Sequence, residues 1–465
     1  MFQRIREWLT LVLIGLLPLH AFLVTVGTKY LAGYGSAPLL VLALWKEAVL
    51  GVLFVFVAVE WVLSKREKKR AAFHIDRFDY CILLLLFVSV FVTVFTHQDW
   101  KLYLFGFKYD FVPLVSFFIL RRCPWSAFFR RAALGVILVL GGLVSVYGLA
   151  TLFLPLEFFR FLGYSDLHSL YLPYAPLAAF QQLSAMGARR IQSTFSGPNQ
   201  LGIWLLLPWS AGVVSLFSAW FRAEHPLLRF GAQRSRRQIP WWLLYTVLVG
   251  AALFFTYSRT AWVAAAAVVI TCIVSNLPWQ RALQNIVRLC GLGAMLLVIL
   301  IVLKPHVVLR VASTKDHLRK PIAAVQSILH HPFGEGLGIA GPASNRVSDA
   351  CVFLSEGADT SWAADRPDLC VFTREKQVQP FGRACTCPRV VENWYLQIGV
   401  EMGVLGFFVY LLLICGVFME LAAVSALFLP FLAVSIAALF LHAWEGSAIA
   451  YTLWILLAVE MRRTD

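Results

Sequence analysis

The chain has 465 residues, of which 60% are hydrophobic and 14% are charged. Its mean hydropathy is +0.75, whereas soluble domains contain only about 45–50% apolar residues. This composition argues against a soluble multidomain enzyme, and most of the chain must lie in bilayer-spanning helices. The net charge of +15 comes from short Lys and Arg clusters between apolar runs. Such clusters are typical of membrane orientation signals and not of nucleic-acid binding, so no nucleic-acid partner is expected.

Apolar stretches define the fold class. About twelve of them are long enough to cross bilayer hydrocarbon roughly 30 Å thick. The first has no clear small-residue cleavage site, so we expect it to remain as a span. We expect an all-α polytopic membrane protein with spans 1–9 in residues 1–304, an external loop domain at 305–392 and spans 10–12 in residues 393–465. The stretches lie near 8–28, 37–63, 80–97, 101–120, 132–155, 199–221, 241–257, 260–277, 284–304, 394–418, 422–441 and 444–461.

Basic clusters predict the orientation of these spans. They follow the second, fourth, sixth and eighth spans, and loops rich in Lys and Arg face the cytoplasm. Both termini are therefore expected in the cytoplasm, and the loops at 156–198, 256–260 and 305–392 are expected to face outward. The clusters comprise Lys65, Arg66, Lys68, Lys69 and Arg70; Arg121, Arg122, Arg130 and Arg131; Arg222 through Arg237; and Arg281 with Arg288.

Four cysteines share the large external loop, namely Cys351, Cys370, Cys385 and Cys387. Cysteines in an external loop favour two disulfides, and three connectivities are open. Zinc is the competing interpretation. It is disfavoured because Cys385-Thr-Cys387 lacks the usual gap between zinc ligands and no convincing histidine partner stands nearby, so we expect no metal site.

The same loop begins with an amphipathic helix near 316–330. Its apolar residues are spaced for one helix face, which would lie either on the membrane surface or against the spans. These residues are Leu318, Ile322, Val325 and Leu329.

The first chemically distinctive segment runs from Arg189 to Asn199 and leads into the sixth span. Its Gly197-Pro198 step fits a helix start, where proline is tolerated. The positive end of that helix would then face outward beside Arg189 and Arg190, which suits phosphate oxygens. Anchoring of the two arginines to lipid headgroups is an equally weighted alternative.

The second segment is the short turn around Ser258 and Arg259, between the seventh and eighth spans. Either Ser258 or Thr256 can cap the following helix. Taken alone, Arg259 fits headgroup contact best. Paired with Arg190, it would supply two guanidinium forks for a lipid-linked diphosphate.

The third segment contains Glu392, Asn393, Tyr395, Gln397 and Glu401 at the start of the tenth span. Glu392 is placed to complement a helix N-terminus, whereas Glu401 lies deeper, where an ionisable group is costly without a partner. The glycines at 399, 403 and 406 are expected to permit close helix packing.

Other polar residues fall at or near the spans. Lys46, Glu47, Lys108 and Asp110 lie inside spans, and mutual pairing is favoured over a polar lumen. His442 and Glu445 lie at a further outer turn. They would either line the same cavity or belong to an exposed loop, and the exposed loop is the simpler account.

In their order along the chain, these segments resemble the O-antigen ligase/O-antigen polymerase family of bacterial membrane proteins, from about residue 185 to 418. The matching segments are Arg190 with Thr194-Phe195-Ser-Gly-Pro198-Asn199; Ser258-Arg259-Thr260-Ala-Trp262; His331-Pro332-Phe-Gly334-Glu-Gly336-Leu-Gly338; and Asn393-Trp-Tyr395-Leu-Gln397 with Glu401 and Gly403.

The resemblance implies an inner-membrane enzyme that transfers a glycan from an undecaprenyl-diphosphate-like carrier to an acceptor hydroxyl on the external face, without a cofactor. Arg190 and Arg259 would hold the diphosphate. Family ligases commonly place a histidine before the matching Asn393, where this chain has Glu392. A carboxylate can act as a general base, so Glu392 is the candidate catalytic residue. Candidate supporting residues are Arg189, Asn199, Ser258, Asn393, Tyr395, Gln397 and Glu401.

Several functions remain open at this point. The acceptor is a lipid, a glycan or a protein, so the alternatives to a ligase of the O-antigen type are a repeat-unit polymerase and a protein-glycan ligase. A transporter or flippase for lipid-linked glycan is the alternative from another class. It is disfavoured because the distinctive residues gather at one face and not near the membrane midplane.

Overall fold

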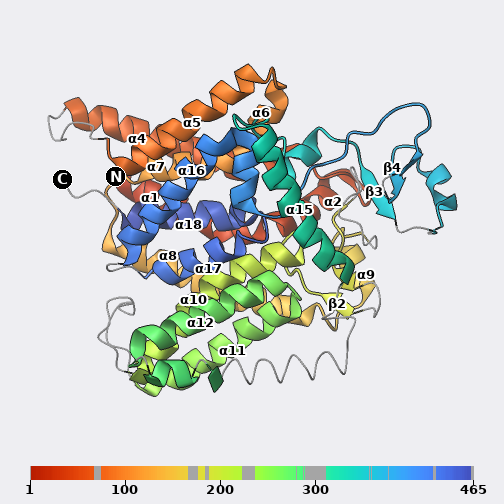
Figure 1. Ribbon diagram of the computed structural model, residues 1–465. Helices are drawn as coiled ribbons and strands as arrows, with labels where there is room; N and C mark the ends of the chain where they lie inside the picture. Colours follow the sequence, from red (N-terminus) through yellow and green to blue (C-terminus); the bar gives the residue numbers. More distant parts are fainter. Residues whose placement is uncertain are drawn as a thin grey trace.

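The computed structural model describes residues 2–66, 75–165, 176–183, 188–221, 236–278, 280–285, 287–288, 311–354, 357, 359–374, 376–422 and 426–461. This part of the chain is mostly helical, with two small sheets (Figure 1). The span expected at 284–304 and most of the basic stretch from Arg222 to Arg237 lie outside the described residues.

The first half of the chain begins with a broken helix. A 3-10 turn at Leu17–Leu19 separates α1 (Phe2–Leu16) from α2 (His20–Ala32), because Pro18 has no N–H to continue the helical hydrogen bonds. The next elements are α3 (Leu40–Ala43), α4 (Trp45–Arg66), α5 (Arg77–Phe95), α6 (Trp100–Gly106), α7 (Val112–Leu120), α8 (Ala127–Ala150), α9 (Leu156–Phe161), β1 (Gln181–Leu183) and β2 (Ala188–Arg190).

The second half contains the remaining helices and a small sheet between them. Strands β3 and β4 are parallel, and β4 and β5 are antiparallel. Figure 1 shows β3 and β4 at the right of the view, far from the N-terminal end of α1 at the left. The elements are α10 (Pro198–Phe221), α11 (Ile239–Phe255), α12 (Arg259–Asn276), α15 (Val311–His330), β3 (Cys351–Leu354), β4 (Cys370–Thr373), β5 (Lys376–Gln379), α16 (Trp394–Ala422), α17 (Phe428–Ala437) and α18 (Ser447–Glu460).

Seven helices of the described part are long and apolar enough to cross a membrane. The helices α11, α17 and α18 are apolar but shorter. The stretch expected at 37–63 divides into α3 and α4 and carries Lys46 and Glu47 at the division. The chain is thus a helical membrane protein. The expected count of twelve spans exceeds the seven candidates because the stretch at 284–304 lies mostly outside the described residues and other apolar helices are short or interrupted.

Two arginines of the expected basic clusters form ion pairs with aspartates inside the fold. Arg121, which is 2% exposed, lies 2.8 Å from Asp76 and 2.9 Å from Asp79. Arg122 lies 2.6 Å from Asp79, and the Asp76 side chain caps α5. A buried arginine needs such partners to offset its desolvation, so these pairs join the start of α5 to the end of α7.

A glycine-rich loop at 331–340 packs into a break in α16. Gly403 interrupts the helical backbone with φ 69°, and Val404 N–H donates to the Pro332 carbonyl at 2.9 Å. A Cβ at Gly334 would lie 2.5 Å from the Glu401 carbonyl oxygen, and a Cβ at Gly338 would lie 2.7 Å from the Leu102 carbonyl oxygen. The glycines at 334, 338 and 403 are therefore required by close approach of two main chains and positive φ.

The amphipathic helix expected near 316–330 is α15, and exposure of its side chains distinguishes the two placements expected for its apolar face. Ile322, Val325 and Leu329 are 60%, 43% and 74% exposed, whereas Ala324 and Ile328 pack with residues of α16. The side chain of Leu318 lies outside the described side chains. The exposed apolar face suits the membrane surface and not a position against the spans.

We expect Gly403→Ala to lower the free energy of unfolding by about 2–4 kcal/mol, because it adds a left-handed backbone penalty and a clash with the 331–340 loop. Gly51→Ala is the matched control, since nothing lies within 4 Å of a Cβ at that position. The measurement is unfolding of the purified protein in detergent. Equal stability of the two variants would contradict the packing of this loop against α16.

Candidate functional site

The segment 190–194 is buried without being helical, and its polar groups bond to main-chain carbonyls of neighbouring helices. Ser193 Oγ donates to Val144 of α8 at 2.8 Å, and Thr194 Oγ1 donates to Pro18 at 2.7 Å. Ile191 N–H donates to Phe255 at 3.1 Å. These bonds hold the segment against three parts of the helix bundle, as irregular backbone within a membrane protein requires.

Arg190 is the charged residue of this segment and is 9% exposed. Its Nε donates to the Thr256 carbonyl at 2.9 Å, while its two terminal nitrogens donate to Gln181 Oε1 and Asn199 Oδ1, each at 2.9 Å. The pairing of β1 with β2 places Gln181 opposite Arg190. All three acceptors are neutral oxygens, and the three bonds fix the orientation of the guanidinium.

Arg189 has a different role from its neighbour. Successive side chains of a strand point to opposite faces, and Arg189 donates to the Leu154 carbonyl at 2.7 Å and lies over the Phe180 ring at 4.6 Å. It binds the chain after α8 instead of joining Arg190. The structure therefore assigns Arg189 to support of the fold around the site.

The turn between α11 and α12 meets the Arg190 segment, as the bond to Thr256 shows. Ser258 is the N-cap residue of α12, but its side chain makes no capping hydrogen bond. Instead, Ser258 N–H donates to Thr256 Oγ1 at 3.2 Å. Ser258 is 2% exposed, and its Oγ has no hydrogen-bond partner among the described residues. A buried hydroxyl that lacks a hydrogen-bond partner in the described structure, next to Arg259 in the sequence, is a candidate for contact with a ligand.

The start of α16 is bound to the end of α17. Asn393 caps α16 by accepting from Leu396 N–H at 2.9 Å, and its Nδ2 donates to the Leu439 carbonyl at 2.8 Å. Tyr395 donates its hydroxyl to the Ser435 carbonyl at 3.0 Å. Asn393 and Tyr395 therefore hold the two helices together.

Glu392 forms an ion pair with a lysine that no sequence motif identifies. Lys320 of α15 lies 2.5 Å from Glu392 Oε1, and the side chain of Glu392 is 19% exposed. Such a pair favours the charged form of the carboxylate over the protonated form. Glu392 also has a positive φ of 57°, a strained conformation of the kind that clusters at functional sites.

A group of polar side chains joins α16 to the turn before α18. His442 Nδ1 lies 3.0 Å from Gln397 Oε1, and Gln397 Nε2 donates to Glu445. Glu445 is 6% exposed, so the expectation of an exposed loop is wrong for this residue. Deeper still, Glu401 accepts from Ala340 N–H at 3.3 Å, and its charge interacts with those of Asp110 and Glu445.

A small pocket of about 70 Å³ lies between the Arg190 segment and the turn before α18. It is lined on one side by Thr194, Ser196 and Gln200, and on another by Gly446 and Ser447. Gln200 directly follows Asn199, which accepts a hydrogen bond from Arg190, and Gly446 directly follows Glu445. The Arg190 segment and the α17–α18 turn therefore lie at the same end of the bundle.

The expected intramembrane charge group is divided. Glu47 lies 3.2 Å from Lys46 and 3.0 Å from Lys108, so these three residues pair as expected. Asp110 is separate from them and interacts with Glu401. One helical turn cannot direct Lys108 and Asp110 to the same partner, because residues two apart in a helix face different sides.

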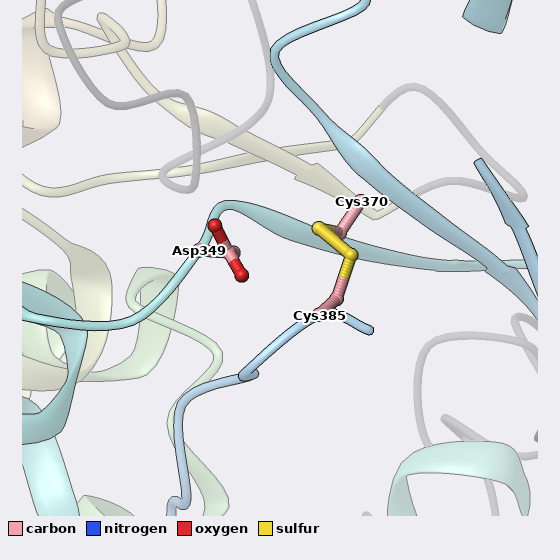
Figure 2. Close-up of side chains that lie close together, drawn as sticks. All are labelled: Asp349, Cys370 and Cys385. Atoms are coloured by element: carbon pink, nitrogen blue, oxygen red, sulfur yellow. A yellow bond between two sulfur atoms is a disulfide. The ribbon is translucent and has the colours of Figure 1, made fainter. Parts of the chain in front are cut away.

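The four cysteines of the 305–392 stretch form two bonds, Cys351–Cys387 and Cys370–Cys385. Figure 2 shows Asp349 beside the second of them, whose sulfur atoms are joined to each other. Zinc binds a thiolate, which a disulfide sulfur is not. A hydrogen bond from Arg383 and one from Thr386 N–H lower the pKa of Asp349, which gives this carboxylate a structural role in the loop.

No protein-family model matches this chain, and no curated protein matches it significantly. The evidence for the site is therefore the geometry of its residues. The sequence analysis did not predict two contacts of the site: Gln181 with Arg190, and Lys320 with Glu392. Neither residue lies in a motif, and Lys320 is 72 positions from Glu392.

We expect peptide mapping under non-reducing conditions to recover the Cys351–Cys387 and Cys370–Cys385 linkages. Replacing both Cys370 and Cys385 by Ser should destabilise the external loop by about 3 kcal/mol, because the bond closes a loop of 15 residues. Faster proteolysis within 341–391 would report this loss. Cys415→Ser, at a free exposed cysteine, is the control, and native labelling of all four loop thiols would contradict the pairing.

Proposed function

We propose that this protein is a metal-independent, inverting glycosyltransferase of the bacterial inner membrane. It moves a glycan from an undecaprenyl-diphosphate-linked donor to an acceptor hydroxyl at the external face. In this proposal, about twelve spans carry the chain, both termini are cytoplasmic, and the disulfide-bonded loop at 305–392 covers the site from outside. The resemblance to O-antigen ligases and polymerases supports this class.

The observation that carries the proposal is the meeting of two arginine-bearing segments. Arg190 binds the Thr256 carbonyl across 66 positions of sequence, and Thr256 lies three residues before Arg259 in the same turn. Arg190 is buried and oriented by neutral acceptors. This contact brings the turn that carries Arg259 to the segment that carries Arg190. In the proposal both guanidinium groups bind the diphosphate, which has two anionic centres.

The role of the arginines in the proposed reaction follows from the charge that develops on the leaving group. When the anomeric carbon separates from the diphosphate, negative charge develops on the bridging oxygen, and fixed cations in a water-poor site stabilise it strongly. Asn199 and Gln181 keep Arg190 in place during this change. Ser258, whose Oγ is buried and has no partner in the described structure, supplies a hydrogen bond to the same group.

Glu392 is the proposed base for the acceptor hydroxyl. It lies at the outer start of α16, next to the α17–α18 turn, and Lys320 keeps it charged. A charged carboxylate within hydrogen-bond reach of the hydroxyl accepts its proton as the oxygen attacks the anomeric carbon. A single displacement inverts the anomeric configuration. Lipid, glycan and protein acceptors all provide the required hydroxyl, so ligase and polymerase activities share this chemistry.

Transport of lipid-linked glycan is the second candidate, and one observation favours it. Asp110, Glu401 and Glu445 form a buried acidic group, and ionisable groups inside a membrane commonly mark transport pathways. Transferase remains the first choice because the arginines and Glu392 lie at helix ends and not along a path through the bundle.

The test is glycan transfer by purified protein from an undecaprenyl-diphosphate-linked oligosaccharide to a panel of lipid, glycan and protein acceptors. Arg190→Ala and Arg259→Ala should each lower kcat by about 10²–10³-fold through loss of charge stabilisation. Arg190→Lys should recover only part of this loss, because an ammonium group cannot reproduce the three oriented hydrogen bonds. Glu392→Gln should lower kcat by about 10²–10⁴-fold.

Arg366→Ala is the control for the arginine variants, since Arg366 is a half-exposed residue of the external loop. Full turnover by folded, donor-binding Glu392→Gln protein would remove Glu392 as the base. The absence of transfer to every acceptor, together with movement of lipid-linked glycan across proteoliposome membranes, would replace the transferase with a transporter.

A further inference from the structure

The small pocket between the Arg190 segment and the turn before α18 has fixed walls. Thr194 lines it, and Thr194 Oγ1 donates to the Pro18 carbonyl at 2.7 Å. Phe22 N–H donates to the Thr194 carbonyl at 3.2 Å. These bonds join the Arg190 segment to both sides of the break at Pro18, so the pocket is formed without a ligand. Preformed pockets of this kind are typical of ligand sites.

The volume of the pocket limits what it can hold. One water molecule needs roughly 10–15 Å³ of such space, so a pocket of about 70 Å³ has room for a group of only a few non-hydrogen atoms. Sites that hold whole ligands measure roughly 300–1,000 Å³, and a complete sugar ring is too large for this one. The pocket therefore suits a single substituent of a larger ligand.

The lining of the pocket is partly apolar and partly polar. Its apolar wall consists of aliphatic side chains from both sides of the Pro18 break and from α18, namely Leu17, Ala21, Ala448 and Ile449. Ser196, Gln200 and Ser447 also line it, and within the described part of the chain no hydrogen bond joins their side chains to another residue. A substituent with both a methyl group and hydrogen-bonding atoms matches the two parts, whereas a phosphate or a plain hydroxyl matches only the polar part.

The pocket adjoins the place proposed for the diphosphate. Arg190 donates to Asn199 Oδ1 at 2.9 Å, and the Cα atom of Gln200 is only about 3.8 Å further along the chain. A Cβ at Gly197 would lie 2.5 Å from Gln200 Oε1, so this glycine leaves space for the amide of Gln200 at the start of α10. In a sugar diphosphate, the ring carbon next to the anomeric carbon is the nearest one with a variable substituent. That substituent is the part of the sugar that the pocket can reach.

We propose that this pocket binds an acylamino substituent on the ring carbon next to the anomeric carbon of the donor's diphosphate-bonded sugar; this rests on the proposed transferase function. The methyl end of the acyl group packs against Ala21 and Ile449. The amide of Gln200 and the hydroxyls of Ser196 and Ser447 form hydrogen bonds with its carbonyl and N–H. These contacts select the donor and leave the displacement at the anomeric carbon to the residues described above. The donor class is therefore a glycan that begins with an N-acylated amino sugar.

The first test compares two undecaprenyl-diphosphate-linked donors that differ only in this substituent, which is acetamido in one and hydroxyl in the other. The wild type should show about 10–100-fold higher kcat/KM with the acetamido donor, because only its substituent fills the pocket. Ala21→Leu fills the pocket with protein atoms, so it should remove the preference and keep activity on the hydroxyl donor. Ala58→Leu, at an exposed alanine of α4, is the control. Equal kcat/KM for the two donors in the wild type would overturn the proposal.

The second test addresses the hydrogen bonds. Gln200→Leu removes the amide and should raise KM for the acetamido donor by about tenfold, because the acyl carbonyl then lacks a donor. The KM for the hydroxyl donor should stay unchanged, since that donor does not use the amide. An equal loss with both donors in folded protein would show a structural role for Gln200 and contradict its assignment to the pocket.

The third test is a gain of function, which a misfolded protein cannot give. The wild type should reject a donor with a butanoylamino group, because its longer chain exceeds the space available. Ile449→Ala enlarges the pocket at a buried wall residue, so this variant should accept the longer donor. Use of the acetamido donor but not of the butanoylamino donor by Ile449→Ala would contradict the placement. Failure of the wild type to bind or transfer any of these donors would instead refute the proposed transferase, so the two failures are distinguishable.

Discussion

Irregular backbone buried among membrane helices must find its hydrogen-bond partners inside the protein, and the architecture of this chain's outer end depends on that constraint. The segment 190–194 meets it by bonding to carbonyls of α8, of the Pro18 break and of the end of α11. Those bonds hold Arg190 rigidly in a buried place where an arginine is otherwise costly. The break at Pro18 is part of the same arrangement, because a continuous helix would have used the carbonyl that Thr194 binds.

The same constraint explains the glycine-rich loop on the other side of the site. Main chains of the 331–340 loop and of α16 approach too closely for any Cβ at Gly334 or Gly403. The loop thereby joins the disulfide-bonded stretch to α16, and α15 brings Lys320 to Glu392. One packing arrangement thus connects that stretch to the carboxylate proposed to accept the proton of the acceptor hydroxyl.

Much of the secondary structure was predictable because it rests on local chemistry. Pro198 at the start of α10, the tight turn between α11 and α12, and α15 follow from proline geometry, turn length and helical periodicity. The external location of the cysteines favoured disulfides, but the connectivity depended on how β3, β4 and the 385–387 stretch pack. Periodicity also left the position of the apolar face of α15 open, since a membrane surface and a protein core attract the same apolar side chains.

By itself, the sequence determined that the chain lives in a membrane and which segments carry unusual polar residues, because hydropathy and motif composition are local properties. Tertiary structure decided which of those residues meet. It joined Arg190 to the turn of Arg259, directed Arg189 away to the carbonyls after α8, paired Glu392 with Lys320 and buried Glu445 behind Gln397 and His442. These contacts span tens to hundreds of residues, and their partners are ordinary side chains. Only the packing of whole helices sets such distances.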